Sequence, residues 1–188
     1  MGLLRNVFRC LFMVVIMVLG SGTASASDLL AKADVRMPDP QSFTPDRFDI
    51  SEVLVKKAER RLYLLDGEDV VRSYRISLGD NPEGHKLYEG DERTPEGEYL
   101  LDWRNDESDF YKSIHISYPS PRDRELAEAW GLDPGGSIMI HGLPNEAGDM
   151  AFAYVGLDWT DGCIAVTNEA MDEIWQLVSN GTPIRILP

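Results

Sequence analysis

Cys163 and His141 are the two residues of this sequence whose types best suit covalent chemistry. A thiol attacks an acyl carbon only as a thiolate, so a nucleophilic cysteine needs a base or another group that lowers its pKa. Each residue has a glycine beside it, Gly142 after the histidine and Gly162 before the cysteine, which lets backbone or ligand approach closely. The pattern indicates Cys163 as a nucleophile, His141 as its base and the neighbouring N–H groups as oxyanion donors.

Other interpretations of these residue types stay open at this level. His85 lies in a polar loop and His115 lies within an expected strand, so each is an alternative base. A metal site would combine His141, Cys163 and a further His or Asp. The sequence has no C-x-x-C or H-x-x-x-H spacing, so we predict that no metal is bound.

The first 26 residues have the composition of a secretory signal peptide. Arg5 and Arg9 give a positive start, residues 10–19 are apolar, and residues 24–26 read Ala-Ser-Ala. The apolar run is shorter than the about 20 residues that a membrane-spanning helix needs. We therefore expect cleavage after Ala26, no stable membrane anchor afterwards, and a periplasmic location. The alternative is an uncleaved N-terminal anchor.

Removal of this segment would change both the charge and the cysteine content. The chain has 18 basic and 32 acidic residues, so loss of Arg5 and Arg9 leaves 16 basic residues and a formal net charge of −16. A protein this negative repels phosphate backbones and anionic lipid surfaces, which argues against nucleic acid or a membrane as partner. With Cys10 removed, Cys163 has no intramolecular disulfide partner. A lone exported thiol is either buried and inert or kept for reactivity.

Residues 27–49 are rich in Asp, Pro and Ser and predict a flexible leader, whereas residues 50–188 predict one β-rich domain. Alternating and β-branched runs predict strands at 53–55, 61–65, 70–78, 99–103, 113–118, 137–141, 164–166 and 183–187. The last of these contains Pro183 and is expected at an edge of the sheet.

Turn and capping residues mark the remaining elements. Asp66-Gly67 predicts a hairpin turn. Helices are expected over 122–130 and over 168–178, the second capped by Asn168. The polar stretch 80–98 is long for a loop, and long ordered loops are often functional.

Two motifs resemble those of the L,D-transpeptidase catalytic domain family. Residues 140–142 read Ile-His-Gly and residues 160–164 read Thr-Asp-Gly-Cys-Ile, as in the active-site signature of that family. Residues 90–99 contain Thr-Pro-Glu-Gly, which looks like the family's Thr-Pro-x-Gly segment. The resemblance covers residues 50–188 and implies a β-rich α+β fold, a single β-sandwich domain with two short helices.

The resemblance also implies a role for each motif residue. Cys163 would attack an acyl carbon next to diaminopimelate, and His141 would take the thiol proton. The backbone carbonyl of Gly142 would orient the imidazole, and the amides of Gly162 and Cys163 would hold the oxyanion. No cofactor is implied, and we expect a thiol whose pKa is depressed by His141.

Two positions depart from the family pattern. Asp161 stands where the family has His, and Ala165 stands where it has Arg or Asn. The support that the lost side chain gives must come from elsewhere, and Thr160, Asp161 and Thr167 are the nearest candidates. These departures resemble those of a sub-branch of acidic exported proteins, whose activity includes release of a lipoprotein from peptidoglycan.

Aromatic and basic residues are the candidates for substrate binding. Trp159 precedes the cysteine motif and is expected to line the cleft, whereas Trp130 and Trp175 fit core positions of the helices. Lys86 and Arg93 are placed to meet substrate carboxylates or, more simply, to pair with nearby acidic residues.

The function implied by the resemblance is cysteine-dependent acyl transfer on peptidoglycan stem peptides, in cell-wall remodelling. The first alternative is a hydrolase, a carboxypeptidase or amidase that releases stem-peptide or lipoprotein links. The second is a wall-binding domain without turnover. The partners expected are peptidoglycan stem peptides and, for the hydrolase, a peptidoglycan-linked lipoprotein.

Overall fold

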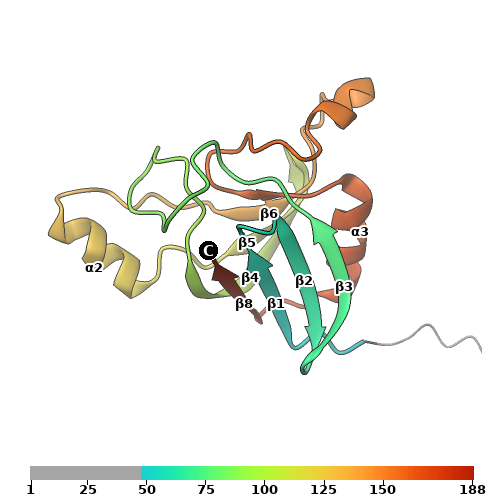
Figure 1. Ribbon diagram of the computed structural model, residues 1–188, viewed down its shortest axis with the longest axis horizontal. Helices are drawn as coiled ribbons and strands as arrows, with labels where there is room; N and C mark the ends of the chain where they lie inside the picture. The colour runs from blue at the N-terminus through green and yellow to red at the C-terminus, as the bar shows by residue number, and fades with distance from the viewer. Residues whose placement is uncertain (1–47) are drawn as a thin grey trace, which may run out of the picture. The chain divides into compact units, whose positions relative to one another are not determined.

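Within the described part of the chain, strands outnumber helices (Figure 1). The computed structural model describes residues 48–188, so the predicted signal peptide and all of the predicted leader except Phe48 and Asp49 lie outside the described residues. The strands are β1 (Glu52–Lys56), β2 (Arg61–Asp66), β3 (Asp69–Arg75), β4 (Gly97–Ser108), β5 (Tyr111–Ile116), β6 (Met139–His141), β7 (Ile164–Ala165) and β8 (Thr182–Leu187). The helices are α2 (Pro121–Ala129), the 3-10 helix η2 (Gly148–Ala153) and α3 (Asn168–Leu177).

The eight strands form one mixed sheet in the order β3-β2-β1-β8-β4-β5-β6-β7. The predicted hairpin at Asp66-Gly67 joins β2 to β3, and Gly67 adopts a φ of 62°, which suits glycine in a tight turn. The predicted β-rich, helix-poor domain is confirmed, and a mixed sheet of this kind is compatible with a sandwich. No helix within residues 48–188 has both the length and the apolar character that a membrane span requires.

The last strand, β8, lies in the middle of the sheet, so its predicted edge position is wrong. It pairs in parallel with β1 and antiparallel with β4. Pro183 pairs with Leu100 of β4, but the pairing with β1 begins only at Ile184. The proline, which lacks an N–H, thus lies where only one neighbour flanks the strand.

A backbone bridge joins the two ends of the strand order. Ser77, just after β3, exchanges N–H···O bonds of 2.9 Å with Ala165 of β7. Gly79 and Thr160 form a second, parallel bridge, in which the Thr160 N–H donates to the Leu78 carbonyl at 3.1 Å and the Asp80 N–H donates to the Thr160 carbonyl at 3.2 Å. A Cβ on Gly79 would lie 1.9 Å from the carbonyl oxygen of Glu92. The bridge brings the start of the long polar loop against the segment that carries Cys163.

The helices are fixed by caps at their first turns. Ser120 and Asp123 form a reciprocal capping box at the start of α2. The N-cap of α3 is Thr167, whose hydroxyl accepts from the Ala170 N–H, so the predicted cap at Asn168 is off by one residue. The buried stripe of α3, which includes Met171, packs on the sheet at β5.

Candidate active site

Cys163 and His141 lie on neighbouring parallel strands. The register pairs Ile140 of β6 with Ile164 of β7 and His141 with Ala165. Side chains alternate between the two faces of a strand, and paired residues share a face. Cys163 directly precedes β7, opposite Met139, so its side chain shares a face with Met139 and His141. The sheet itself therefore brings the predicted nucleophile and the predicted base together.

Both residues line one cleft of about 340 Å³. Its other walls come from the β4–β5 hairpin and from the segments before β6 and β7. The full lining consists of Asn105, Glu107, Ser108, Asp109, Phe110, Ser113, Ser137, Met139, His141, Trp159, Thr160, Asp161 and Cys163. The hairpin residues were not predicted, because the polar run from Arg104 to Ser108 shows no strand alternation. The turn that follows it brings Phe110 within 4.7 Å of the His141 ring, between centroids.

His141 is held in one tautomer. Its Nδ1 lies 2.6 Å from the carbonyl oxygen of Gly142. A carbonyl oxygen only accepts, so Nδ1 carries the proton and Nε2 keeps a lone pair. The side chain is 3% exposed, and this burial lowers the pKa of His141, although the Gly142 carbonyl opposes the shift. The neutral imidazole is thus the stable form, with one basic nitrogen available.

Gly142 leaves no room for a side chain. A Cβ there would lie 2.6 Å from Oδ1 of Asn168 and 2.8 Å from Cβ of Tyr111. The Gly142 N–H donates to the Phe110 carbonyl at 3.1 Å, and Asn168 Oδ1 accepts from the Leu143 N–H at 2.9 Å. Asn168 therefore positions the turn that orients His141. The sequence did not suggest this role, because Asn168 was expected to cap a helix.

Cys163 is a partly exposed thiol whose Sγ lies 3.6 Å from the Ser137 carbonyl oxygen. Burial raises the pKa of Cys163 above its ordinary value of 9.0, and the charge of Asp161 adds to the rise. The Met139 backbone N–H and the charge of Lys86 act in the opposite direction but do not reverse it. The expected depressed pKa is thus wrong, because a desolvated site disfavours the thiolate. The resting pair is a neutral thiol beside a neutral imidazole.

The turn before the cysteine is fixed by Thr160. Its hydroxyl donates to the Cys163 carbonyl oxygen at 2.7 Å and accepts from the Gly162 N–H at 3.2 Å. The Gly162 N–H is therefore engaged inside the turn rather than directed at the expected oxyanion. The buried Thr94 hydroxyl donates to the Gly162 carbonyl at 2.9 Å. This bond links the Thr-Pro segment at 94–95 directly to the cysteine turn.

Comparison with known proteins assigns the domain. The YkuD family pattern, described as the L,D-transpeptidase catalytic domain, matches residues 51–186. The chain belongs to the L,D-transpeptidase catalytic domain family.

Individual relatives agree with this assignment. The Escherichia coli K12 protein named "Putative L,D-transpeptidase YafK" is 34% identical over 134 residues, which cover 68% of this chain and 46% of YafK. The chain thus spans about half the length of that relative. Among solved structures, the helical cell shape determining protein Pgp2 of Campylobacter jejuni is 27% identical with a TM-score of 0.57, over 73% of this chain and 47% of Pgp2. Bd1075 of Bdellovibrio bacteriovorus is 22% identical with a TM-score of 0.50, and the alignment covers 74% of this chain and 48% of Bd1075. It shares the fold.

This L,D-transpeptidase domain accommodates its two departures from the family pattern differently. Ala165 is buried between Ser77 and β6, where its backbone closes the sheet. Asp161 is exposed, and its charge disfavours the thiolate rather than supporting it. Of the expected substitutes for the lost support, Thr160 fixes the cysteine turn and Thr167 caps α3.

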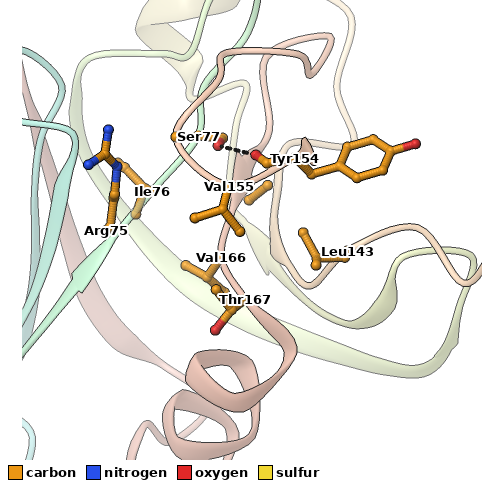
Figure 2. A pocket seen from close by; sticks show the side chains of 10 residues that line it. Arg75, Ile76, Ser77, Leu143, Tyr154, Val155, Val166 and Thr167 are labelled. Carbon is orange, nitrogen blue, oxygen red and sulfur yellow. Dashed lines mark hydrogen bonds between the residues drawn. The ribbon is translucent and has the colours of Figure 1, made fainter. Parts of the chain in front are cut away.

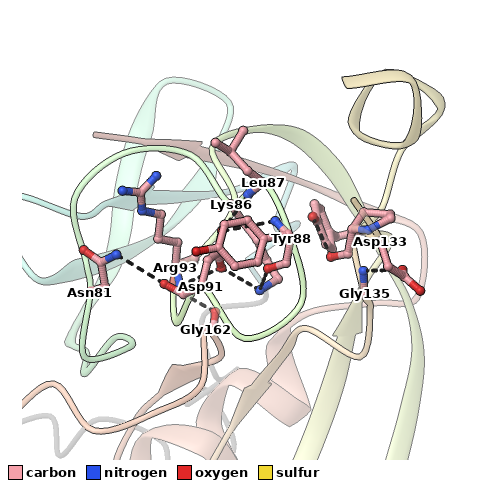
Figure 3. A network of polar contacts seen from close by, with 12 residues as sticks. Asn81, Lys86, Leu87, Tyr88, Asp91, Arg93, Asp133, Gly135 and Gly162 are labelled. Atoms are coloured by element: carbon pink, nitrogen blue, oxygen red, sulfur yellow. Dashed lines mark hydrogen bonds and ion pairs between the residues drawn. The ribbon is translucent and has the colours of Figure 1, made fainter. Parts of the chain in front are cut away.

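The structure places neither Lys86 nor Arg93 among the residues that line the cleft. Lys86 is 3% exposed and its Nζ lies 2.8 Å from Oδ1 of Asp91, in the ion pair that was the simpler expectation. Asp91 also accepts from the backbone N–H groups of Leu87 and Tyr88, which orders the polar loop (Figure 3). Although burial opposes its charge, these bonds and Lys86 lower the pKa of Asp91.

Arg93 contributes through its backbone. A Cβ on Gly162, whose φ is 120°, would lie 2.5 Å from the Arg93 carbonyl oxygen. The Arg93 side chain extends away from Gly162 (Figure 3). The polar loop therefore packs against the cysteine turn and does not line the cleft.

Trp159 lines the cleft as expected, edge-on to His141 with 5.8 Å between ring centroids. The segment that leads to it is anchored near a small pocket of about 10 Å³ (Figure 2). There the Ser77 hydroxyl donates to the Tyr154 carbonyl at 3.2 Å, and a Cβ on Gly156 would lie 2.9 Å from the Arg75 guanidinium. Anchoring at this point fixes the position of Trp159 beside the imidazole.

Within residues 48–188, no three His, Cys, Asp or Glu side chains converge in a way that could hold a metal ion. The cleft offers a thiol, an imidazole and backbone amides as its reactive groups.

Proposed function

We propose that this domain catalyses cysteine-dependent acyl transfer on peptidoglycan stem peptides, in cell-wall remodelling. The observation that carries the proposal is the tautomer of His141. Its Nδ1–H is committed to the Gly142 carbonyl, which leaves Nε2 as a base in the cleft that Cys163 lines. Membership of the L,D-transpeptidase catalytic domain family supports the same chemistry.

The neutral resting pair implies a concerted first step. As the thiol of Cys163 attacks the acyl carbon, Nε2 of His141 takes its proton, so no free thiolate accumulates. The carbonyl oxygen becomes an oxyanion, and the backbone amide of Cys163 is the donor we assign to it, since that of Gly162 is engaged with Thr160. Collapse of the adduct breaks the C–N bond, and His141 passes the proton that it took from the thiol to the leaving amine.

The second step divides the candidate activities. An amine that attacks the thioester gives a new cross-link, which is transpeptidation, whereas water gives a trimmed peptide. For a lipoprotein link, the lipoprotein is the amine that leaves in the first step, and water then frees the stem peptide from Cys163. Pgp2 is named as a determinant of helical cell shape, and its 27% identity supports a role for this protein in cell shape. We propose that the reaction takes place in the periplasm, after removal of residues 1–26, whose composition supports export.

Incubation of the purified mature chain with disaccharide-tetrapeptides tests the proposal. Mass spectrometry should detect cross-linked dimers for a transpeptidase, or trimmed monomers for a hydrolase. Cys163→Ala should lower either rate by three or more orders of magnitude, as expected for loss of a nucleophile, with an unchanged melting temperature. Wild-type turnover by the alanine variant would refute the assignment. Absence of both products with the wild-type protein would leave the wall-binding alternative and a hydrolase that acts only on lipoprotein links.

A further inference from the structure

The sheet carries a second polar and aromatic cluster on the face that holds Cys163. Leu101 of β4 pairs with Ile116 of β5, and the next pair is Arg104 with Ile114. Two residues of β4, Asp102 and Trp103, therefore lie opposite the single residue His115. This is a β-bulge, a device that redirects side chains and that recurs beside active sites.

Both bulge residues contact His115. The Trp103 ring stacks on the imidazole at 4.8 Å between centroids, with only 16° between their planes. Oδ1 of Asp102 lies 2.7 Å from Nδ1 of the same ring. Trp103 nevertheless remains 43% exposed, and the Asp102 side chain remains 41% exposed. The contacts thus fix an indole face and a carboxylate while leaving both accessible.

The cluster continues the catalytic cleft across the sheet. His115 pairs directly with Met139, which lines the cleft opposite Cys163. One cross-strand row therefore runs from Cys163 through Met139 and His115 to Trp103. It spans three strand spacings of about 4.8 Å, or about 14 Å in total.

A stem peptide joined to its sugar matches this separation. Three extended residues reach at most about 10 Å from the reacting carbon, and the lactoyl arm that links them to the sugar adds a few more ångströms. A pyranose ring has an apolar C–H face and a rim of hydrogen-bonding groups. An exposed indole face beside a fixed carboxylate offers the complement to both.

We propose that Asp102, Trp103 and His115 form a subsite for a pyranose ring of the glycan strand to which the stem peptide is attached. The proposal deepens the proposed function, since the row leads from the nucleophile assigned there. Trp103 stacks on the sugar face, and the oxygen of Asp102 that does not face His115 accepts from a hydroxyl or N-acetyl N–H. His115 holds both side chains in place.

Binding to Cys163→Ala protein tests the subsite without turnover. Calorimetry would compare a disaccharide-tetrapeptide with the same tetrapeptide lacking sugar. We expect the disaccharide ligand to bind at least about tenfold more tightly, and Trp103→Ala to remove that advantage while leaving sugar-free affinity unchanged. Trp103→Tyr should keep it. Trp130→Ala is the matched control, because Trp130 is 75% exposed at the end of α2.

Two results would overturn the subsite. One is equal affinity for the two ligands before any substitution at Trp103. The other is a loss of affinity in Trp103→Ala or Asp102→Asn that is as large for the sugar-free tetrapeptide as for the disaccharide ligand. Such a loss would indicate that the cluster binds an ammonium group of the peptide. Failure of the proposed function is separate, because it concerns turnover by the wild-type thiol. Sugar binding that depends on Trp103 would survive a missing reaction.

Discussion

His141 and His85 lie in two clefts of the same domain, and the comparison shows what separates a base from a structural histidine. His141 commits Nδ1–H to a carbonyl and keeps the lone pair of Nε2. His85 accepts from the Glu96 N–H at Nδ1, at 3.0 Å, and its Nε2 lies 3.2 Å from Oδ1 of Asp123. Both nitrogens of His85 are thus engaged, and none is left to accept a proton from a substrate.

The size of a cleft does not identify the reactive one. The groove beside His85 measures about 730 Å³, against about 340 Å³ for the cleft of Cys163. Asp123 in the larger groove is already bound by the Tyr99 hydroxyl at 3.1 Å and by the Ser120 N–H at 2.8 Å, as part of the cap of α2. The polar groups of the larger groove therefore serve to stabilise α2, whereas the smaller cleft contains His141, the imidazole with an available lone pair.

The largest expected effect separates the two histidines directly. His141→Gln should lower kcat/KM by two to four orders of magnitude, about the contribution of a general base. His85→Gln should change it by less than about threefold but lower the melting temperature, since the partly buried bonds to Glu96 and Asp123 are weakened or lost. Steady-state kinetics and thermal unfolding of both variants check this. A larger kinetic loss for His85→Gln would show that the wrong base is assigned.

A second test compares steric with electrostatic positioning. The polar loop near His85 is held by ion pairs such as Lys86–Asp91, whereas the cysteine turn is held by backbone contact at Gly162. Gly162→Ala should lower kcat at least about tenfold, because a misplaced nucleophile costs rate steeply.

Gly67→Ala is the matched control for this substitution. Gly67 also has a positive φ, 62°, but no atom lies within 4 Å of its Cβ position. Its variant should lose stability, by about 1 kcal/mol, without loss of kcat. Equal kcat losses in the two variants would contradict the steric account.

Some of this molecule could be predicted from single residues and short patterns. Asp66-Gly67 marked its hairpin because few residues adopt the backbone of such a turn. The Ile-His-Gly and Thr-Asp-Gly-Cys motifs located two strands that prove to be neighbours in the sheet. The assignment of chemical roles to Cys163 and His141 stays a prediction until kinetics are measured.

Other features depend on partners distant in the sequence. Pro183 suggests an edge strand locally, yet β8 is central, and its pairing with β1 begins only one residue later, at Ile184. Trp130 fits a core position by periodicity but is 75% exposed. The bulge at Asp102 and Trp103 depends on the register with β5, which no local pattern reveals.

The smallest expected effect is on the pH dependence of the thiol, and it tests whether the pair at rest is neutral. Burial lowers the pKa of His141 below its ordinary value of 6.5 and raises that of Cys163 above 9.0. The imidazole loses its proton as pH rises through its lowered pKa, so kcat/KM should rise with pH on the acid side, with an apparent pKa below 6.5. His141→Gln should remove this limb. Iodoacetamide should modify folded Cys163 slowly at neutral pH and faster only as pH rises above 9, whereas the thiol of the unfolded chain should already react at lower pH. Rapid alkylation of the folded wild-type protein at pH 6, lost in His141→Gln, would instead demonstrate a thiolate–imidazolium pair. The thiol proton would then move to His141 before substrate binds. His141 would differ from His85 in its charge rather than in having an available lone pair.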